Sequence, residues 1–157
     1  MLEKIRAQWT KVIHPFALGL LKLGVTPDMV TWTGTIATII VALVFFPQGW
    51  LWQGVAVLAL FIFSDSLDGT MARESGSSSK WGAFLDSTLD RLADGAIFGG
   101  IAIYYAAQPD GLLWCAVAIG ALVFALVTSY SKARGESVGI EVHAGFAGRA
   151  DRLLVGL

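Results

Sequence analysis

The sequence predicts an all-α membrane protein, a polytopic helix bundle that begins with an amphipathic helix. Of its 157 residues, 55% are hydrophobic and only 15% are charged, whereas a soluble domain carries about 25% charged residues. The apolar residues form runs of about 20, which is the length of a helix that crosses a bilayer. The net charge of −1 creates no strong positive field, so we expect no nucleic-acid partner.

The first segment, over about 2–23, mixes apolar residues with Lys4, Arg6 and Lys11. This mixture is typical of an amphipathic helix that lies in the membrane interface. The alternative is a charged flank of the first span with no role of its own.

Four spans are predicted next, over about 28–46, 50–72, 81–107 and 112–131. The first begins with Thr26-Pro27-Asp28, which supplies an N-cap, a proline at the first helical position and an acid in the first turn. Turns are expected at 47–49, 76–79 and 108–111.

A loop is expected after the fourth span, to about Gly148, and a fifth helix from about Arg149. The chain stops a few residues into that helix. We therefore expect 1–157 to be one membrane domain that is truncated at its C-terminus.

The distribution of Lys and Arg predicts the orientation. The loops at 47–49 and 108–111 contain neither residue, whereas both occur before the first span, between the second and third, and after the fourth. Cytoplasmic loops carry the excess of positive charge. The N-terminus and the 76–79 loop are therefore expected on the cytoplasmic side of the cell membrane.

Four aspartates gather around that loop, in the stretch DSLDGTMARESGSSSKWGAFLDSTLD at 65–90. Asp65 and Asp68 are spaced i, i+3, and Asp86 and Asp90 are spaced i, i+4, so each pair shares a helix face. Carboxylates in a bilayer are costly and are functional candidates by default. Their oxygens are the ligands that hard divalent cations prefer. The pattern predicts a metal-dependent membrane enzyme.

Written as D-x2-D-G-x2-A-R-x8-G-x3-D-x3-D, this stretch resembles the signature of the CDP-alcohol phosphotransferase family at every fixed position. Those positions are Asp65, Asp68, Gly69, Ala72, Arg73, Gly82, Asp86 and Asp90. The resemblance covers nearly the whole chain. The flanking segments at 26–28 and 129–134 are similar to the phosphatidylinositol phosphate synthases of actinobacteria, a branch of that family. The family resemblance implies six spans in complete members and a homodimer. It also implies an enzyme that joins an acceptor alcohol to the phosphate of a CDP-linked lipid or alcohol and releases CMP.

The resemblance also implies the roles of individual residues. The metal ligands would be Asp65, Asp68, Asp86 and Asp90, holding two Mg²⁺ ions, with Mn²⁺ as an alternative. Asp90 would also take the proton from the acceptor hydroxyl. CDP-diacylglycerol would contact Asp28, Met29, Val30, Thr31, Gly69, Arg73 and Ser79. Asp94 lies outside the signature, and we interpret it as a partner of Arg91 or of another polar group.

The acceptor is predicted from residues near the end of the chain: Ser129, Lys132, Arg134, Arg149 and Arg152. Each basic residue could be an ordinary positive-inside flank. Together they favour a phosphorylated acceptor over serine, choline or ethanolamine. The 129–134 segment favours inositol 1-phosphate, which would give phosphatidylinositol phosphate. Glycerol 3-phosphate, the substrate for phosphatidylglycerophosphate synthesis, is the alternative.

Two other classes of protein use acidic residues in membranes. An intramembrane prenyltransferase would carry its two aspartate motifs several spans apart, whereas here one short loop separates them. A metal transporter would need polar residues at mid-membrane on several spans, and the first and fourth spans offer almost none beyond threonines.

Overall fold

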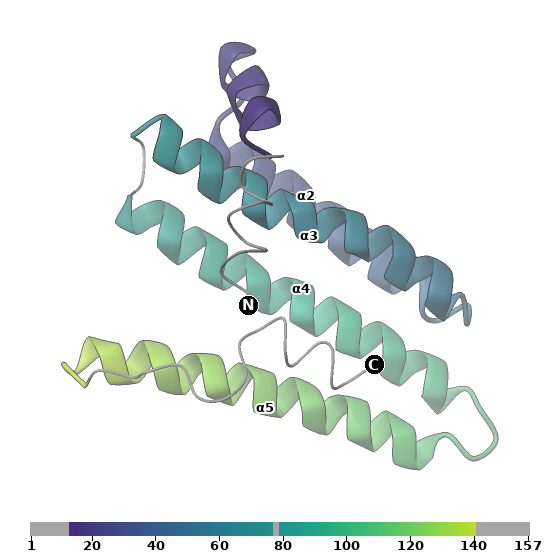
Figure 1. Cartoon of the computed structure of the whole chain (residues 1–157). Helices are drawn as coiled ribbons and strands as arrows, with labels where there is room; N and C mark the ends of the chain where they lie inside the picture. The colour runs from purple at the N-terminus through teal and green to yellow at the C-terminus, as the bar shows by residue number, and fades with distance from the viewer. Residues whose placement is uncertain (1–12, 77–78, 141–157) are drawn as a thin grey trace, which may run out of the picture. The chain divides into compact units, whose positions relative to one another are not determined.

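The computed structural model describes residues 13–76 and 79–140, except for the side chains of 62–65, and these ranges contain helices and no strand. A helix over 13–22 is followed by α2 (Pro27–Phe45), α3 (Leu51–Glu74), α4 (Lys80–Ala106) and α5 (Leu112–Ser137) (Figure 1). The all-α prediction is confirmed. The chain divides into two compact units, Met1–Leu122 and Val123–Leu157, and α5 begins in the first and ends in the second.

The start of α2 follows the prediction. The Thr26 side chain accepts a hydrogen bond from the Met29 amide at 3.3 Å, and Pro27 stands at the first helical position. The helix ends at Phe45, and Gly49 takes a φ of +78° in the turn that leads to α3. That region of φ is open mainly to glycine, so this residue allows the tight reversal.

The core of the first unit lies where α2 packs against both α3 and α4. Ala42 of α2 is fully buried, and a Cβ atom added to Gly100 of α4 would come within 2.5 Å of the Ala42 carbonyl oxygen. The ring of Phe46, 1% exposed, occupies the space that a side chain at Gly54 of α3 would need. Small residues permit the same close approach between helices in membranes generally.

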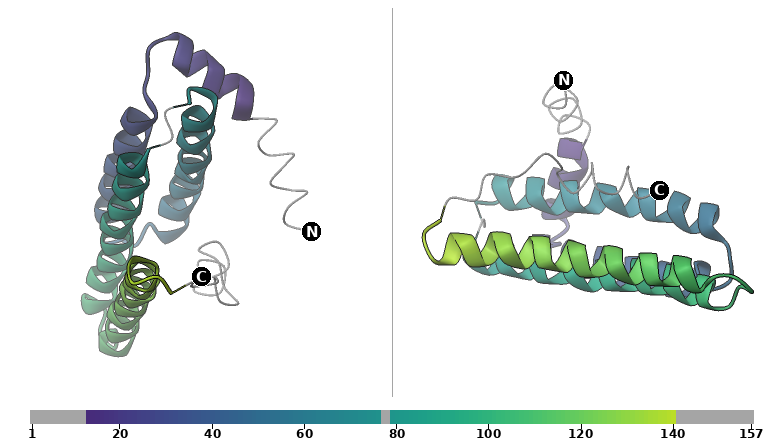
Figure 2. Two further views of the ribbon diagram at one scale, coloured as in Figure 1. Left: turned by 90° about the vertical axis from the view of Figure 1, so that its left-hand side faces the viewer. Right: turned by 90° about the horizontal axis from the view of Figure 1, so that it is seen from below.

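These contacts place three helix ends together. Phe46 near the end of α2 meets Gly54 near the start of α3, so α2 and α3 are antiparallel, whereas α2 and α4 run the same way. The N-termini of α2 and α4 and the C-terminus of α3 therefore share one end of the unit. The helix over 13–22 crosses that end at a steep angle to the other three (Figure 2).

The 13–22 helix contacts this end through one pair of polar side chains and through apolar burial. Its His14 Nε2 lies 3.3 Å from Glu74 Oε1 at the end of α3. Ala17 is fully buried, while Phe16 remains 67% exposed. The helical character predicted for 2–23 is confirmed over 13–22. Residues 1–12 lie outside the described residues, and a position in the membrane interface stays a prediction.

Three helices, α2, α3 and α5, are long and apolar enough to cross a membrane. The 27 residues of α4 make a rod of about 40 Å, at 1.5 Å per residue, which is also long enough. Its first 15 residues include Asp86, Asp90, Arg91 and Asp94, however, so its composition does not mark it as a span. Four spans, and a fifth helix from Arg149 that lies outside the described residues, stay predictions.

One boundary prediction was wrong. The loop expected from residue 132 begins later, because α5 continues to Ser137. The added turns contain Lys132 and Glu136, whose side chains approach to 3.9 Å at i, i+4 spacing, a pairing that favours helix. Gly139, with a φ of +80°, then ends the helical path.

We expect Gly100→Ala to lower the free energy of unfolding by about 1–3 kcal/mol, the usual cost of overpacking, because its Cβ atom would press on the Ala42 backbone. Gly99→Ala is the matched control, since nothing lies within 4 Å of its added Cβ atom. Better helix propensity should make that variant neutral or more stable by up to about 1 kcal/mol. Unfolding in mixed micelles measures both, and equal effects of the two variants would contradict this packing.

Candidate functional site

Asp68 is held in place between α2 and α3. It is 7% exposed. Its Oδ2 accepts a hydrogen bond from Thr31 Oγ1 at 2.6 Å, and its Oδ1 accepts one from the Gly69 amide at 2.6 Å. A buried carboxylate is tolerable only when such donors replace water. Both oxygens are thus oriented by donors, and a carboxylate oxygen can accept more than one bond.

Thr31 has a second acceptor within reach. Its Oγ1 lies 3.1 Å from the carbonyl oxygen of Pro27, one turn earlier in α2. A hydroxyl has a single proton to donate, so it can serve the carbonyl or Asp68 but not both fully. The Asp68 contact is shorter and its acceptor is charged, so it is the stronger of the two. Thr31 can therefore adjust to a ligand on Asp68 without losing its own partner.

The first turns of α2 and α4 lie side by side. Asp28 Oδ1 is 3.9 Å from the position that a Cβ atom on Gly82 would occupy. From these two residues, Thr31 is about 4.5 Å further along α2 and Asp86 about 6 Å further along α4, at 1.5 Å per residue. Because Asp68 contacts Thr31, Asp68 and Asp86 lie at nearly the same level along the unit.

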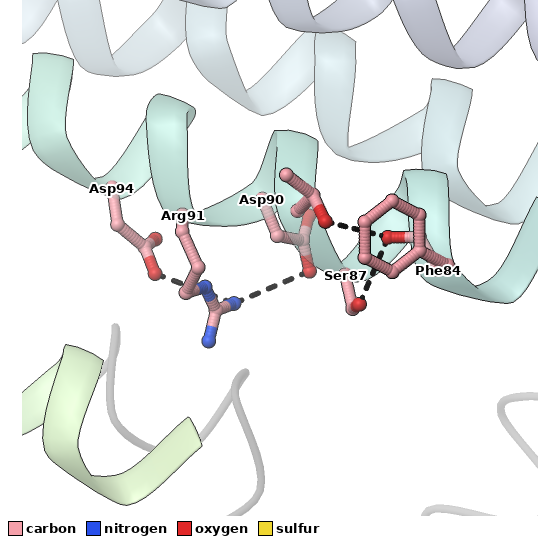
Figure 3. Close-up of polar contacts among 6 residues, drawn as sticks. Phe84, Ser87, Asp90, Arg91 and Asp94 are labelled. Carbon is pink, nitrogen blue, oxygen red and sulfur yellow. Dashed lines mark hydrogen bonds and ion pairs between the residues drawn. The ribbon is translucent and has the colours of Figure 1, made fainter. Parts of the chain in front are cut away.

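The second signature carboxylate of α4 belongs to a charged cluster. Arg91 Nη2 lies 3.4 Å from Asp90 Oδ2 and 3.4 Å from Asp94 Oδ2 (Figure 3). The side chains of Asp90 and Asp94 are 20% and 11% exposed. The interpretation of Asp94 as a partner of Arg91 is confirmed. Asp86, one turn before Asp90, is exposed.

The candidate metal ligands at this end, Asp68, Asp86 and Asp90, all offer carboxylate oxygens. These are the ligand atoms that a hard divalent cation prefers. Among the described side chains, which do not include that of Asp65, no group of three or more His, Cys, Asp or Glu residues is arranged to hold a metal ion. Within the same ranges α3 and α4 each pack against α2 and not against each other. That Asp65, Asp68, Asp86 and Asp90 converge on a metal therefore stays a prediction. It is supported by their carboxylate chemistry and by the similar positions of Asp68 and Asp86 along the helix axes.

The residues predicted to bind the nucleotide lipid surround the same end of the unit. Asp28, Met29, Val30 and Thr31 form the first turns of α2, and Ser79 caps α4 by accepting the Gly82 amide at 2.9 Å. Arg73 is exposed, with Nη2 3.1 Å from Thr70 Oγ1 and Nη1 beside Gly69. Two neighbouring helix N-termini and a guanidinium favour a bound anion.

The predicted acceptor residues belong to the second unit. Ser129, Lys132 and Arg134 lie on the C-terminal half of α5, and both basic side chains are exposed. Arg134 Nη1 is 3.5 Å from Ser137 Oγ. Arg149 and Arg152 lie outside the described residues. That these residues bind the acceptor phosphate beside the aspartates stays a prediction.

Two contacts of the site were not predicted from the sequence. Thr31 was predicted to contact the nucleotide lipid, whereas the structure also makes it the partner of Asp68. The contact of Arg91 with Asp90 was missed, because adjacent residues do not normally face each other on a helix and their spacing gave no signal.

The family model for CDP-alcohol phosphatidyltransferases matches residues 24–156. Phosphatidylinositol phosphate synthase of Cutibacterium acnes is 58% identical over the whole chain, which covers 76% of that protein. The synthase of Streptomyces avermitilis is 54% identical over the whole chain, which covers 65% of its length. The chain thus spans between about two thirds and three quarters of these relatives.

Solved structures of the Mycobacterium tuberculosis phosphatidylinositol phosphate synthase have the same fold. The one with CDP-DAG bound is 41% identical with a TM-score of 0.88, over 92% of this chain and 73% of that one. The one in complex with manganese and citrate is 42% identical with a TM-score of 0.86, over 91% and 68%. These neighbours support a membrane protein that uses a divalent metal.

We expect Thr31→Val to weaken Mn²⁺ binding by about 10–100-fold, the usual effect of losing a partner that orients a metal ligand. Thr31→Ser keeps the hydroxyl and should stay close to the unchanged protein. Thr33→Val is a control, since the Thr33 hydroxyl bonds only the exposed Met29 carbonyl among the contacts described. Calorimetric Mn²⁺ titration of the purified proteins measures all three. Equal affinities for Thr31→Val and Thr33→Val would show that Thr31 does not support the metal site.

Proposed function

Because the chain belongs to the CDP-alcohol phosphatidyltransferase family, we propose that it transfers the phosphatidyl group of CDP-diacylglycerol to inositol 1-phosphate. The products are phosphatidylinositol phosphate and CMP. The observation that carries this proposal is the identity of 58% with a phosphatidylinositol phosphate synthase along the entire chain. Family membership also sets aside the prenyltransferase and transporter alternatives.

The donor binds where the N-termini of α2 and α4 meet. Asp28, Met29, Val30 and Thr31 contact the cytidine end, and Gly69, Arg73 and Ser79 surround the diphosphate. Support comes from the exposed Arg73 guanidinium, which can form paired hydrogen bonds with phosphate oxygens, and from Gly69 beside it, which has no side chain to obstruct the phosphate. The fatty acyl chains extend along the apolar helices into the membrane.

The four signature aspartates bind the metal. We assign Asp65, Asp68, Asp86 and Asp90 as ligands of two Mg²⁺ ions, with Mn²⁺ able to replace them. Such ions would neutralise the diphosphate and stabilise the departing CMP. Support comes from the level shared by Asp68 and Asp86, and from the donors that fix both oxygens of Asp68.

Asp90 acts as the general base. It takes the proton of the acceptor hydroxyl while that oxygen forms a bond to the phosphatidyl phosphorus. The bond from the same phosphorus to the CMP oxygen breaks, and CMP leaves with the electron pair. A carboxylate whose side chain is 20% exposed is accessible to a substrate hydroxyl and largely shielded from bulk water.

The phosphate of the acceptor binds one serine and four basic residues between positions 129 and 152. We assign Ser129, Lys132, Arg134, Arg149 and Arg152 to this role. Support comes from the exposed side chains of Lys132 and Arg134 and from charge complementarity with a phosphate. Glycerol 3-phosphate has the same phosphate group and is the competing acceptor.

We place the site and the N-terminus on the cytoplasmic face of the cell membrane. The loops at 47–49 and 108–111, at the opposite end of the helices, contain no Lys or Arg, whereas cytoplasmic loops carry the excess of positive charge. The 13–22 helix, which crosses the site end of the unit, would lie in the membrane interface with the segment that precedes it. We further propose a homodimer, as the family resemblance implies.

Asp90→Asn should reduce turnover at least 10²–10⁴-fold, the contribution of a general base, because it removes the base and one anionic ligand. Binding of CDP-diacylglycerol should persist, since Arg73 and three carboxylates remain. Release of CMP from CDP-diacylglycerol measures turnover. Asp110→Asn, an exposed change in the turn before α5, is the matched control and should be fully active. Turnover of Asp90→Asn near that of the control would remove Asp90 from both roles.

Arg134→Ala should raise the KM for the acceptor by about ten-fold or more, since a hydrogen bond to a charged group contributes about 1.5–3 kcal/mol. The KM for CDP-diacylglycerol should change little. Lys22→Ala removes an equal charge from an exposed position that we also propose to be cytoplasmic, and it controls for effects on membrane insertion.

Both variants should be assayed with inositol 1-phosphate and glycerol 3-phosphate side by side. Normal acceptor kinetics in Arg134→Ala, together with poor expression, would reduce Arg134 to a topology determinant. Faster turnover with glycerol 3-phosphate would change the acceptor and leave the family assignment unaffected.

A further inference from the structure

The charged cluster on α4 contains two residues that the proposed reaction does not use. They are Arg91 and Asp94, and Asp94 lies one turn beyond the last signature carboxylate, Asp90. The guanidinium of Arg91 lies between the carboxylates of Asp90 and Asp94 (Figure 3). The same nitrogen, Nη2, stands 3.4 Å from an oxygen of each. A single donor is thus divided between the general base and a buried acid.

Arg91 reduces the repulsion between two neighbouring carboxylates, those of Asp90 and Asp94. Asp90 and Asp94 are spaced i, i+4, so their carboxylates are neighbours on one helix face and repel each other. Asp94 is 8% exposed, and charges shielded from water are screened less than surface charges. Arg91 cancels one of the two negative charges. The formal charges of these three side chains sum to −1, which is the charge that Asp90 needs as a ligand and as a base.

Because Arg91 Nη2 is shared between two carboxylates, its hold on Asp90 is weaker than that of a full ion pair. An arginine and a carboxylate left to themselves tend to form two parallel hydrogen bonds. Such a pair would engage both oxygens of Asp90 and compete with any ligand. Asp94 draws Nη2 along the helix, so Arg91 can orient Asp90 through Oδ2 without neutralising it.

We propose that Arg91 is a positioning residue for Asp90 and that Asp94 keeps Arg91 from closing over it. This inference rests on the proposed function, because it takes Asp90 as metal ligand and general base. Neither Arg91 nor Asp94 touches substrate in this scheme. Their effect is on the orientation and the available charge of Asp90.

The alternative is that the cluster only neutralises charge in a helix within the membrane. The two ideas predict different results for a pair of variants. In Asp94→Asn the guanidinium loses the charge of its second carboxylate and shifts toward Asp90, so positioning predicts weaker metal binding and slower turnover. In the double variant Asp94→Asn with Arg91→Gln the competing cation is gone, so metal affinity should recover. If the cluster only neutralises charge, Asp94→Asn leaves a compensated Asp90–Arg91 pair that binds Mn²⁺ normally, and the double variant, whose Asp90 has lost Arg91, is less stable than either single variant.

The test measures Mn²⁺ affinity calorimetrically, and turnover by CMP release, on the full chain in detergent. We expect Asp94→Asn to weaken Mn²⁺ binding by about 10-fold or more, within the range for partners of a metal ligand. The kcat should fall by a similar factor, with the KM for CDP-diacylglycerol changed by less than about 3-fold. The double variant should return to within a few fold of the unchanged affinity.

Two controls separate the outcomes. Asp110→Asn should leave both readings unchanged, and thermal melting of each variant shows whether it is folded. An Asp94→Asn protein that is folded but binds Mn²⁺ normally overturns the positioning role, as does a double variant that binds more weakly than either single change. Absence of CMP release from the unchanged protein with every acceptor would instead overturn the proposed function, while the Mn²⁺ titrations would still report the coupling of Arg91 and Asp94 to Asp90.

Discussion

The backbone contact between α2 and α4 at Ala42 and Gly100 is the constraint on which the first unit depends. A side chain at residue 100 would collide with the Ala42 carbonyl, so only glycine allows the two helices to approach at this level. Helices are stiff, and the register set there is carried along α4 for about 27 Å, at 1.5 Å per residue, to Gly82 beside Asp28. A backbone packing contact toward one end therefore determines where the carboxylates stand at the other.

The buried acids of this unit are compensated in two different ways. Asp68 obtains its donors from a neighbouring helix and from its own backbone, through Thr31 and Gly69. Asp94 obtains its partner from its own helix, through Arg91. The first arrangement ties α3 to α2 and makes the position of Asp68 depend on packing. The second would form in α4 wherever that helix lay, since the residues are three apart.

The two halves of α4 have separate tasks. The first half carries the charges that the proposed chemistry needs, and the second half carries the small residues Ala96 and Gly100 that pack on α2. Composition alone therefore does not mark α4 as a membrane span. The helix is held in the unit by its packing against α2. That packing depends on the shapes of the side chains, which the average composition of α4 does not describe.

The sequence by itself determined the all-α class, the start of α2 at Pro27 and the faces that carry the paired aspartates, because caps and helical periodicity act over a few residues. The contact of Thr31 with Asp68 and the common level of Asp68 and Asp86 were decided only by the tertiary structure. Both depend on how Ala42, Phe46, Gly54 and Gly100 interlock, and the axial offset of two helices is set by side-chain shapes that meet across the interface. No local pattern in either helix contains that information.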